Sequence, residues 1–591
     1  MWLMRLVGTT LLRRSHPHIM DSEVDQHWGR PLEQYAASYG ITNGARVIVS
    51  WEIEEEAQLV KEAMYGQILN AHGPVEGMGN FLGANDITLP MLETVLKLAH
   101  SPRHLDFFAD PVFIGGCIRL LAQIRPEGRP SPFSHELGYL CFRIIVIGIG
   151  AWILKITENL DMTIAAMETD LRIGPLLVFS GHVSRALEKV IFEMAGRASC
   201  DWIMGWARTP GHTNPERFLL PTDLRSLLNI LWEDRKLYLR ALLTTYFPGL
   251  SGIMFVLWRF LDVNPAVEAG RPTELMVVPF CELLWRSMLA ATADQLALLA
   301  YISSFVQQYK RADLWDKSPK YIDLDDSRTL LYALNTRMAP ADLRFFAPLC
   351  LWRTGVVWRF VTQSIQPGSE DLFPALFGGT MGCIWRGIEE GDLKPPDIVE
   401  KAGSVFASLG KIITPLNHPN HPNGAVVEDL VAELEKHDFI ELLARLIILL
   451  KPGEARSTLD RSVSRNTMFI NNTLFLVRTL AQAAPTMLLG NRLRQQAGDW
   501  SKMNCKLLMY ELLGPSHAPK AHKALHRESK ELWAEIAQIL ELNLWTGTLA
   551  RHDCSYSRCP YGKGILPVEF MCTRCHDFSF RYCSTQCQMR D

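Results

Sequence analysis

Apolar residues recur at intervals of three and four positions through most of the chain, from about Trp51 to Ala550. Residues at this spacing share one face of an α-helix, so the pattern is that of successive amphipathic helices. Alternation of apolar and polar positions, which would indicate half-buried strands, is scarce. The hydrophobic pattern therefore predicts an all-α body, residues 45–548, in which helix follows helix.

The clearest unit of this pattern runs from Asn423 to Gly453 and predicts a helical hairpin. Asp438 and Glu441 have the spacing of a capping box at the start of its second helix, and Pro452 follows the end of that helix. The two apolar stripes comprise Val426, Val427, Leu430, Val431 and Leu434, and then Leu442, Leu443, Leu446, Ile447 and Leu450.

Further helices are predicted between short joints rich in proline, glycine and asparagine. The expected helices span about 275–310, 327–338, 372–389, 396–412, 466–489, 499–513 and 526–549, and the joints lie near 124–135, 208–222, 313–324, 364–371, 414–424 and 451–459. Such chains stack as armadillo or HEAT-like solenoids, whose repeats span about 40–47 residues, or pack as irregular helical bundles. No fixed period decides between these two architectures.

The dipeptide Trp-Arg recurs at positions 258, 285, 352, 358 and 385, without a regular interval. On a helix this pair predicts a buried ring beside a cation that extends toward solvent. The recurrence therefore predicts packing and does not indicate a ligand site.

Length and composition limit the number of folding units and the classes of partner. The chain has 591 residues, and single cores stop growing at about 250–300 residues, so more than one cooperative unit is expected. A net charge of −3 gives no general attraction to phosphate backbones, and no nucleic acid is expected as a partner.

The longest apolar run, Ile144–Leu154, is shorter than the roughly 20 residues of a membrane helix. It predicts a buried helix or strand, and no membrane association is expected.

The first 44 residues form a separate N-terminal segment that we expect to be partly disordered. Arg5, Arg13 and Arg14 precede the first acidic residue, Asp21, which resembles a mitochondrial presequence. We favour the alternative that these first residues are disordered, or that they are attributed to the chain in error.

Cysteine spacing is the strongest chemical signal. Six of the thirteen cysteines fall in the last 38 residues, as Cys554-x4-Cys559, Cys572-x2-Cys575 and Cys583-x3-Cys587. Pairs at this spacing let two thiolates reach one ion, and two pairs complete the tetrahedron that zinc prefers. A segment of this size cannot bury a sufficient core, so metal binding, at about 10–16 kcal/mol, would supply its folding energy. We therefore predict a small zinc finger at residues 549–591.

A disulfide framework is the alternative use of these cysteines, and it requires an oxidising compartment. The other seven cysteines are scattered singly through apolar stretches, as buried thiols are. They favour zinc binding in an intracellular protein, cytoplasmic or nuclear.

The tail resembles a MYND-type zinc finger. The resemblance lies in Cys572-Thr-Arg-Cys575, then six residues, then Tyr582-Cys583-Ser584-Thr585-Gln586-Cys587-Gln588. It implies two interleaved zinc sites, the first held by Cys554, Cys559, Cys583 and Cys587, and the second by Cys572 and Cys575. The four-residue spacing of the first pair departs from the two residues that the family more often has.

The family's last tryptophan, histidine and cysteine have no counterpart before Asp591, so the second zinc site is incomplete in this chain. We expect the natural chain to continue; completion by a histidine such as His552 or His576 is the alternative. The resemblance implies that the finger binds partner proteins through short proline-containing peptides. A helical body with a terminal MYND finger resembles a group of uncharacterised fungal proteins.

An enzymatic alternative comes from the string Asn417-His418-Pro419-Asn420-His421-Pro422-Asn423, which is similar to a motif of SET-domain lysine methyltransferases that use S-adenosylmethionine. A SET domain would also need a strand-rich body and a later Asp-Tyr step, and no Asp-Tyr follows residue 423. His522 and His526 have the spacing of a zincin pair, but Lys523 stands where the zincin glutamate would be. We predict a zinc-binding adaptor without catalytic residues, with the methyltransferase as the alternative.

Overall fold

The computed structural model describes residues 25, 27–41, 49–70, 87–124, 128, 131–170, 174–194, 200–205, 218–263, 274–308, 311–391, 393–417, 424–452, 461–484, 486–493, 496, 500, 502–504, 506–508, 511, 519–542, 570–571 and 581–582. It divides the chain into two compact units, Met1–Ser318 and Pro319–Asp591. Helices dominate the described part of both units, which confirms the predicted all-α body. The division falls inside the predicted joint 313–324, within the predicted body 45–548.

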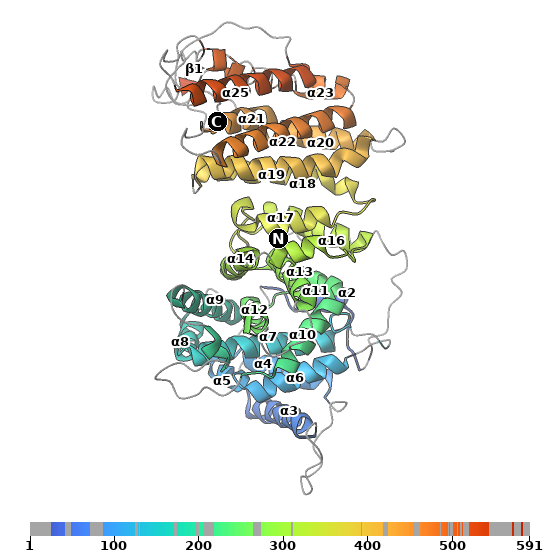
Figure 1. The fold of residues 1–591 in the computed structure, drawn as a ribbon. Coiled ribbons are helices and arrows are strands. Elements are labelled where there is room, and N and C mark those ends of the chain that lie inside the picture. Colours follow the sequence, from blue (N-terminus) through green and yellow to red (C-terminus); the bar gives the residue numbers. More distant parts are fainter. Residues whose placement is uncertain are drawn as a thin grey trace. The chain divides into compact units, whose positions relative to one another are not determined.

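The named elements of unit 1 are all helices in its described part (Figure 1). Its elements are α2 (Leu32–Tyr35), η1 (Ala36–Ser38), α3 (Trp51–Asn70), α4 (Leu89–Ala99), η3 (Pro102–His104), α5 (Leu105–Phe108), α6 (Pro111–Gln123), α7 (Glu136–Ile156), α8 (Leu160–Thr169), α9 (Pro175–Met194), η5 (Cys200–Met204), α10 (Pro221–Glu233), α11 (Arg235–Thr244), α12 (Leu250–Val263), α13 (Glu274–Ala290), α14 (Ala293–Gln308) and α15 (Arg311–Lys317).

Helix α7 forms the centre of this unit's core. It is apolar on every face, and its residues from Glu136 to Leu154 are buried. Helices α4, α5, α6, α9 and α12 pack around it. By length and composition α7 could cross a membrane, but in this unit it is surrounded by protein, as a helix that is hydrophobic all round must be in a core. The predicted buried segment Ile144–Leu154 is therefore confirmed as part of a core helix.

Part of the N-terminal segment, residues 27–41, folds against the start of α7. Arg30 Nε donates to Glu136 Oε2 at 2.7 Å, and the Tyr39 hydroxyl donates to Glu136 Oε1 at 2.7 Å. Burial by itself would raise the pKa of Glu136, but the hydrogen bonds from Arg30 and Tyr39 bring it below its ordinary value. Tyr35 is fully buried, so this part of the segment belongs to the core of unit 1.

Unit 2 contains a second set of helices and, near its end, a short pair of strands. Its elements are α16 (Leu324–Met338), α17 (Leu351–Gln363), η7 (Glu370–Leu372), α18 (Phe373–Glu390), α19 (Pro395–Ile413), η8 (Thr414–Asn417), α20 (Gly424–Lys436), α21 (Phe439–Ile448), α22 (Arg461–Ala483), α23 (Thr486–Leu493), α25 (Lys520–Ile539), β1 (Phe570–Met571) and β2 (Arg581–Tyr582).

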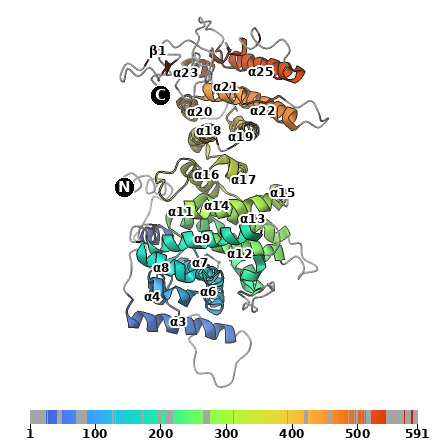
Figure 2. The ribbon, with the colours of Figure 1, turned by 90° about the vertical axis from the view of Figure 1, so that its left-hand side faces the viewer.

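The helices of unit 2 stack in two layers. In one layer α16 packs against α18, α18 against α20, and α20 against α23; in the other α17 packs against α19, α19 against α22, and α22 against α25. Figures 1 and 2 show the same order of helices within this unit. Stacked helix pairs are the arrangement of a solenoid, so unit 2 follows the first predicted architecture, while unit 1 is an irregular bundle around α7.

The predicted hairpin at 423–453 is confirmed as α20 and α21, but its capping box is wrong. Asp438 has φ 52°, in the left-handed region, and its side chain makes no capping hydrogen bond to α21. Only His437 and Asp438 separate the two helices, so the chain reverses at Asp438 in this left-handed conformation. Glu441 is fully buried.

Candidate functional site

The six predicted metal ligands, Cys554, Cys559, Cys572, Cys575, Cys583 and Cys587, lie outside the described residues. Two short strands within the predicted finger are described. They pair antiparallel, with Phe570 opposite Tyr582 and Met571 opposite Arg581. Cys572 follows β1 directly in the sequence, and Cys583 follows β2 directly.

The cysteines outside the finger behave largely as predicted. Cys117, Cys141, Cys200, Cys281 and Cys383 are buried, and Cys350 is half-buried. Burial raises the pKa of the Cys117 and Cys141 thiols, as expected for thiols used in packing. Cys505 lies outside the described residues. Across the described ranges, no group of three or more His, Cys, Asp or Glu residues could hold a metal ion.

The residues of the enzymatic alternatives are partly described. Asn417 ends η8, and its amide donates to Gln482 Oε1 of α22 at 3.2 Å. His418 and the rest of that string, to residue 423, lie outside the described residues. His522 is exposed and His526 is half-buried on α25, and burial lowers the pKa of His526.

Two of the Trp-Arg pairs illustrate different uses of the cation. The Arg259 guanidinium lies 4.8 Å from the centroid of the buried Trp258 ring, and its Nε donates to Asp201 at 2.8 Å. In the next pair Arg286 is itself fully buried and its Nη2 donates to Glu282 at 2.8 Å. The predicted buried ring is confirmed in both pairs, but Arg286 does not extend toward solvent because Glu282 pairs with it inside the core.

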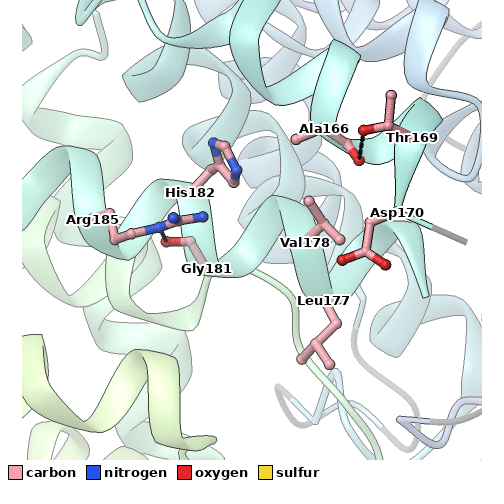
Figure 3. Close-up of a pocket in the computed structure, with 8 residues that line it drawn as sticks. All are labelled: Ala166, Thr169, Asp170, Leu177, Val178, Gly181, His182 and Arg185. Atoms are coloured by element: carbon pink, nitrogen blue, oxygen red, sulfur yellow. Dashed lines mark hydrogen bonds between the residues drawn. The ribbon is translucent and has the colours of Figure 1, made fainter. Parts of the chain in front are cut away.

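A cleft of about 380 Å³ lies in unit 1 between α8 and α9. Figure 3 shows the side chains that line it. Helix α8 contributes Ala166 and Thr169, followed by Asp170, and α9 contributes the rest of the lining, which comprises Leu177, Val178, Gly181, His182 and Arg185. The two helices pack against each other, so the cleft is a groove along their contact.

His182 is the most informative polar group of the cleft. It is only 8% exposed, and no hydrogen bond to its ring nitrogens is found within the described ranges. Burial and then the charge of Arg185 lower the pKa of His182 below its ordinary value. The imidazole is therefore neutral at pH 7, with one N–H donor and one acceptor nitrogen.

Arg185 lies one turn further along α9 on the same face. Its Nε donates to the Gly181 carbonyl at 3.2 Å, which orients the guanidinium over the helix. Glu188 interacts electrostatically with Arg185. Burial raises the pKa of Glu188, and the positive charge of Arg185 reduces that increase. No ion pair within 4.0 Å joins Arg185 to an acid among the described residues.

The α8 side of the cleft is different in character. The Thr169 hydroxyl donates to the Ala165 carbonyl at 2.9 Å, so it serves the end of its own helix. Asp170 follows α8, and Figure 3 shows its carboxylate beside Val178. The cleft thus has a carboxylate on one wall, an imidazole and a guanidinium on the other, and an apolar floor.

Sequence reasoning did not find this cleft. His182 and Arg185 are three residues apart, which places them on one helical face, and this spacing was the available signal. Such pairs are common on solvated helices, and the burial of His182 depends on packing between helices.

Comparisons with known proteins add no assignment. No family model matches this chain, and neither a curated protein nor a solved structure matches it. Function must be argued from the residues themselves.

Proposed function

We propose that this protein is an adaptor whose C-terminal finger binds zinc and captures proline-containing peptides of partner proteins. The three cysteine pairs of residues 554–587 carry the proposal, because their spacing suits tetrahedral thiolate coordination. The likeness of the tail to MYND-type fingers supplies the peptide-binding role.

The strand pair of the finger connects the second and third cysteine pairs in the sequence. In an antiparallel ladder the carboxyl ends of the two strands lie at opposite ends. Cys572 continues from the carboxyl end of β1, and Cys583 continues from the carboxyl end of β2. The second and third cysteine pairs thus each begin directly after a strand, which suits a small module whose strands are held together by metal.

The stacked helices of unit 2 suit the same role. Solenoids present extended surfaces to partners because each helix pair adds a similar strip of surface. Helix α25 is the last described helix, and the finger follows it within the same unit. A helical surface and a finger in one unit would allow a partner to be held at two places.

The test is to compare the full chain with its Cys583→Ser variant. We expect reduced, natively purified protein to contain about one zinc per chain if the four-thiolate set alone is filled, and about two if a histidine completes the second site. Cys583→Ser should lose one zinc and the capture of peptides from a synthetic library of proline-containing sequences. The thermal transitions of the helices should stay unchanged.

Ser584→Ala is the matched control, since it alters the neighbouring side chain without removing a thiolate. A zinc content of zero in the unaltered chain, or peptide capture that survives Cys583→Ser, would overturn the proposal. Transfer of labelled methyl groups from S-adenosylmethionine that stops on His418→Ala would support the methyltransferase instead.

A further inference from the structure

We propose that the cleft between α8 and α9 binds a small organic monocarboxylate that carries an apolar group. This site lies in unit 1 and is independent of the finger, so it adds a second binding activity to the proposed adaptor. The inference depends on two features of the cleft: two adjacent hydrogen-bond donors, and an apolar lining of limited volume.

The two donors are positioned by helix geometry. His182 and Arg185 are separated by three residues on α9, so they lie about 4.5 Å apart along the helix axis on one face. The Arg185 Nε is engaged by the Gly181 carbonyl, which leaves the two terminal nitrogens to face a ligand. Terminal guanidinium nitrogens bind a carboxylate through two parallel hydrogen bonds.

His182 makes the site more than a surface arginine. The side chain is 8% exposed, and its ring nitrogens make no hydrogen bond among the described residues yet are open to the solvent of the cleft, where a ligand can reach them. Its neutral form can donate one N–H to the second oxygen of a carboxylate bound at Arg185. The ligand would thereby replace water at this N–H.

The floor of the cleft defines the rest of the ligand. Ala166, Leu177 and Val178 offer aliphatic surface beyond the two donors. The volume of about 380 Å³ is at the small end of the range for small-molecule sites, about 300–1,000 Å³. An aromatic or branched aliphatic group of modest size fits this space better than a long chain or a folded partner.

The positive charge available in the cleft restricts the charge of the ligand. Arg185 is the one Lys or Arg among the described residues that line the cleft, so the cleft offers a single positive charge to a bound anion. Glu188, near Arg185, would also disfavour a dianion. A monocarboxylate is therefore favoured over a dicarboxylate or a phosphate ester.

The test uses 4-phenylbutyrate as the probe, with 4-phenylbutanol as its uncharged counterpart, in calorimetric titrations of the full chain. We expect saturable binding of one equivalent of 4-phenylbutyrate, with binding of the alcohol at least tenfold weaker. Arg185→Gln should weaken binding of the acid at least tenfold, and His182→Phe, which keeps the volume of the ring without its N–H, should weaken it several-fold. Zinc removal should not alter binding, which separates this site from the finger.

Lys189→Gln is the charge-matched control, because Lys189 lies one turn beyond Arg185 on α9 and does not line the cleft. Its variant should bind 4-phenylbutyrate as the unaltered chain does. Arg185 is exposed, so its replacement should not impair folding even if His182→Phe does, and circular dichroism checks both. Absence of saturable binding, equal affinity for the alcohol, or an equal loss with Lys189→Gln would overturn the proposal.

Discussion

Arg337 buries a guanidinium group in the last turn of α16. It is 3% exposed, and none of its three side-chain nitrogens has a hydrogen-bond partner within the described part of the chain. Burial lowers the pKa of Arg337 to about 10, so the group still carries its charge at neutral pH. The Phe346 ring, 5.2 Å away, and the carbonyl end of α16 compensate this charge in part.

Replacing Arg337 with leucine should therefore stabilise the protein. The substitution removes a buried charge that lacks hydrogen bonds and keeps most of the apolar contact, so the free energy of unfolding should rise by about 1–3 kcal/mol. Urea denaturation monitored by circular dichroism measures this change. Arg344→Leu, at an exposed arginine that pairs with Asp342 at 2.7 Å, is the control and should have little effect. A loss of stability in Arg337→Leu would mean that the guanidinium is satisfied in the folded protein.

At the scale of elements, Asp234 connects the turn between α10 and α11 with the segment that leads into α7. Its carboxylate accepts hydrogen bonds from the Phe133 N–H at 3.0 Å and from the Ser131 hydroxyl at 3.2 Å. Burial raises the pKa of Asp234 to about 7, against these two hydrogen bonds, which lower it. The junction of three helices thus depends on a carboxyl group that gains or loses its proton near neutral pH.

This raised pKa predicts a pH dependence of stability. Between about pH 4 and pH 7 the folded chain keeps a proton that the unfolded chain has released, so the free energy of unfolding falls as pH rises. Asp234→Asn keeps the shape and one acceptor oxygen but cannot ionise. We expect this variant to be more stable than the unaltered chain at pH 8, on the order of 2–4 kcal/mol, with a smaller difference at pH 4.5.

Urea denaturation of both proteins at the two pH values tests this expectation. Glu233→Gln, at the exposed neighbouring acid on α10, is the matched control and should not change the pH profile. A stability difference that is the same at pH 4.5 and pH 8 would show that Asp234 does not titrate in this range.

The ends of helices could be predicted where residues that interrupt helices mark them in the sequence. The helices expected at 327–338, 372–389 and 396–412 are confirmed as α16, α18 and α19, because proline, glycine and asparagine mark the intervening joints. The single helix expected at 275–310 is wrong: α13 and α14 break at Ala291 and Thr292, which carry no such mark. The start of α14 is marked instead by Thr292 and Gln295, which have the spacing of a capping box: the Thr292 N–H donates to Gln295 Oε1 at 3.3 Å. Apolar periodicity alone does not reveal this signal.

At the scale of the whole molecule, the two compact units should unfold as separate cooperative bodies. Phe142 on α7 is fully buried against Phe133 and Tyr238, and Phe406 on α19 is fully buried against Phe439 and Phe469. Each phenylalanine therefore belongs to the core of a different unit.

Calorimetry of the full chain should show two transitions. Phe142→Ala should lower one and Phe406→Ala the other, each by about 3–5 kcal/mol in unfolding free energy, because each leaves a cavity in one core. The two variants control for each other, since the same side chain is removed from both units. If both variants lower a single common transition, the chain folds as one cooperative body.

The amino-acid sequence by itself determined the helical character of the body and the position of the cysteine pairs, because helical periodicity and ligand spacing are local properties of a chain. The tertiary structure decided which helices share a core, that α7 is central, and that His182 and Arg337 lack hydrogen bonds among the described residues. These features arise when side chains distant in sequence pack together, and a hydrophobic stripe on a helix does not specify which other stripe will cover it.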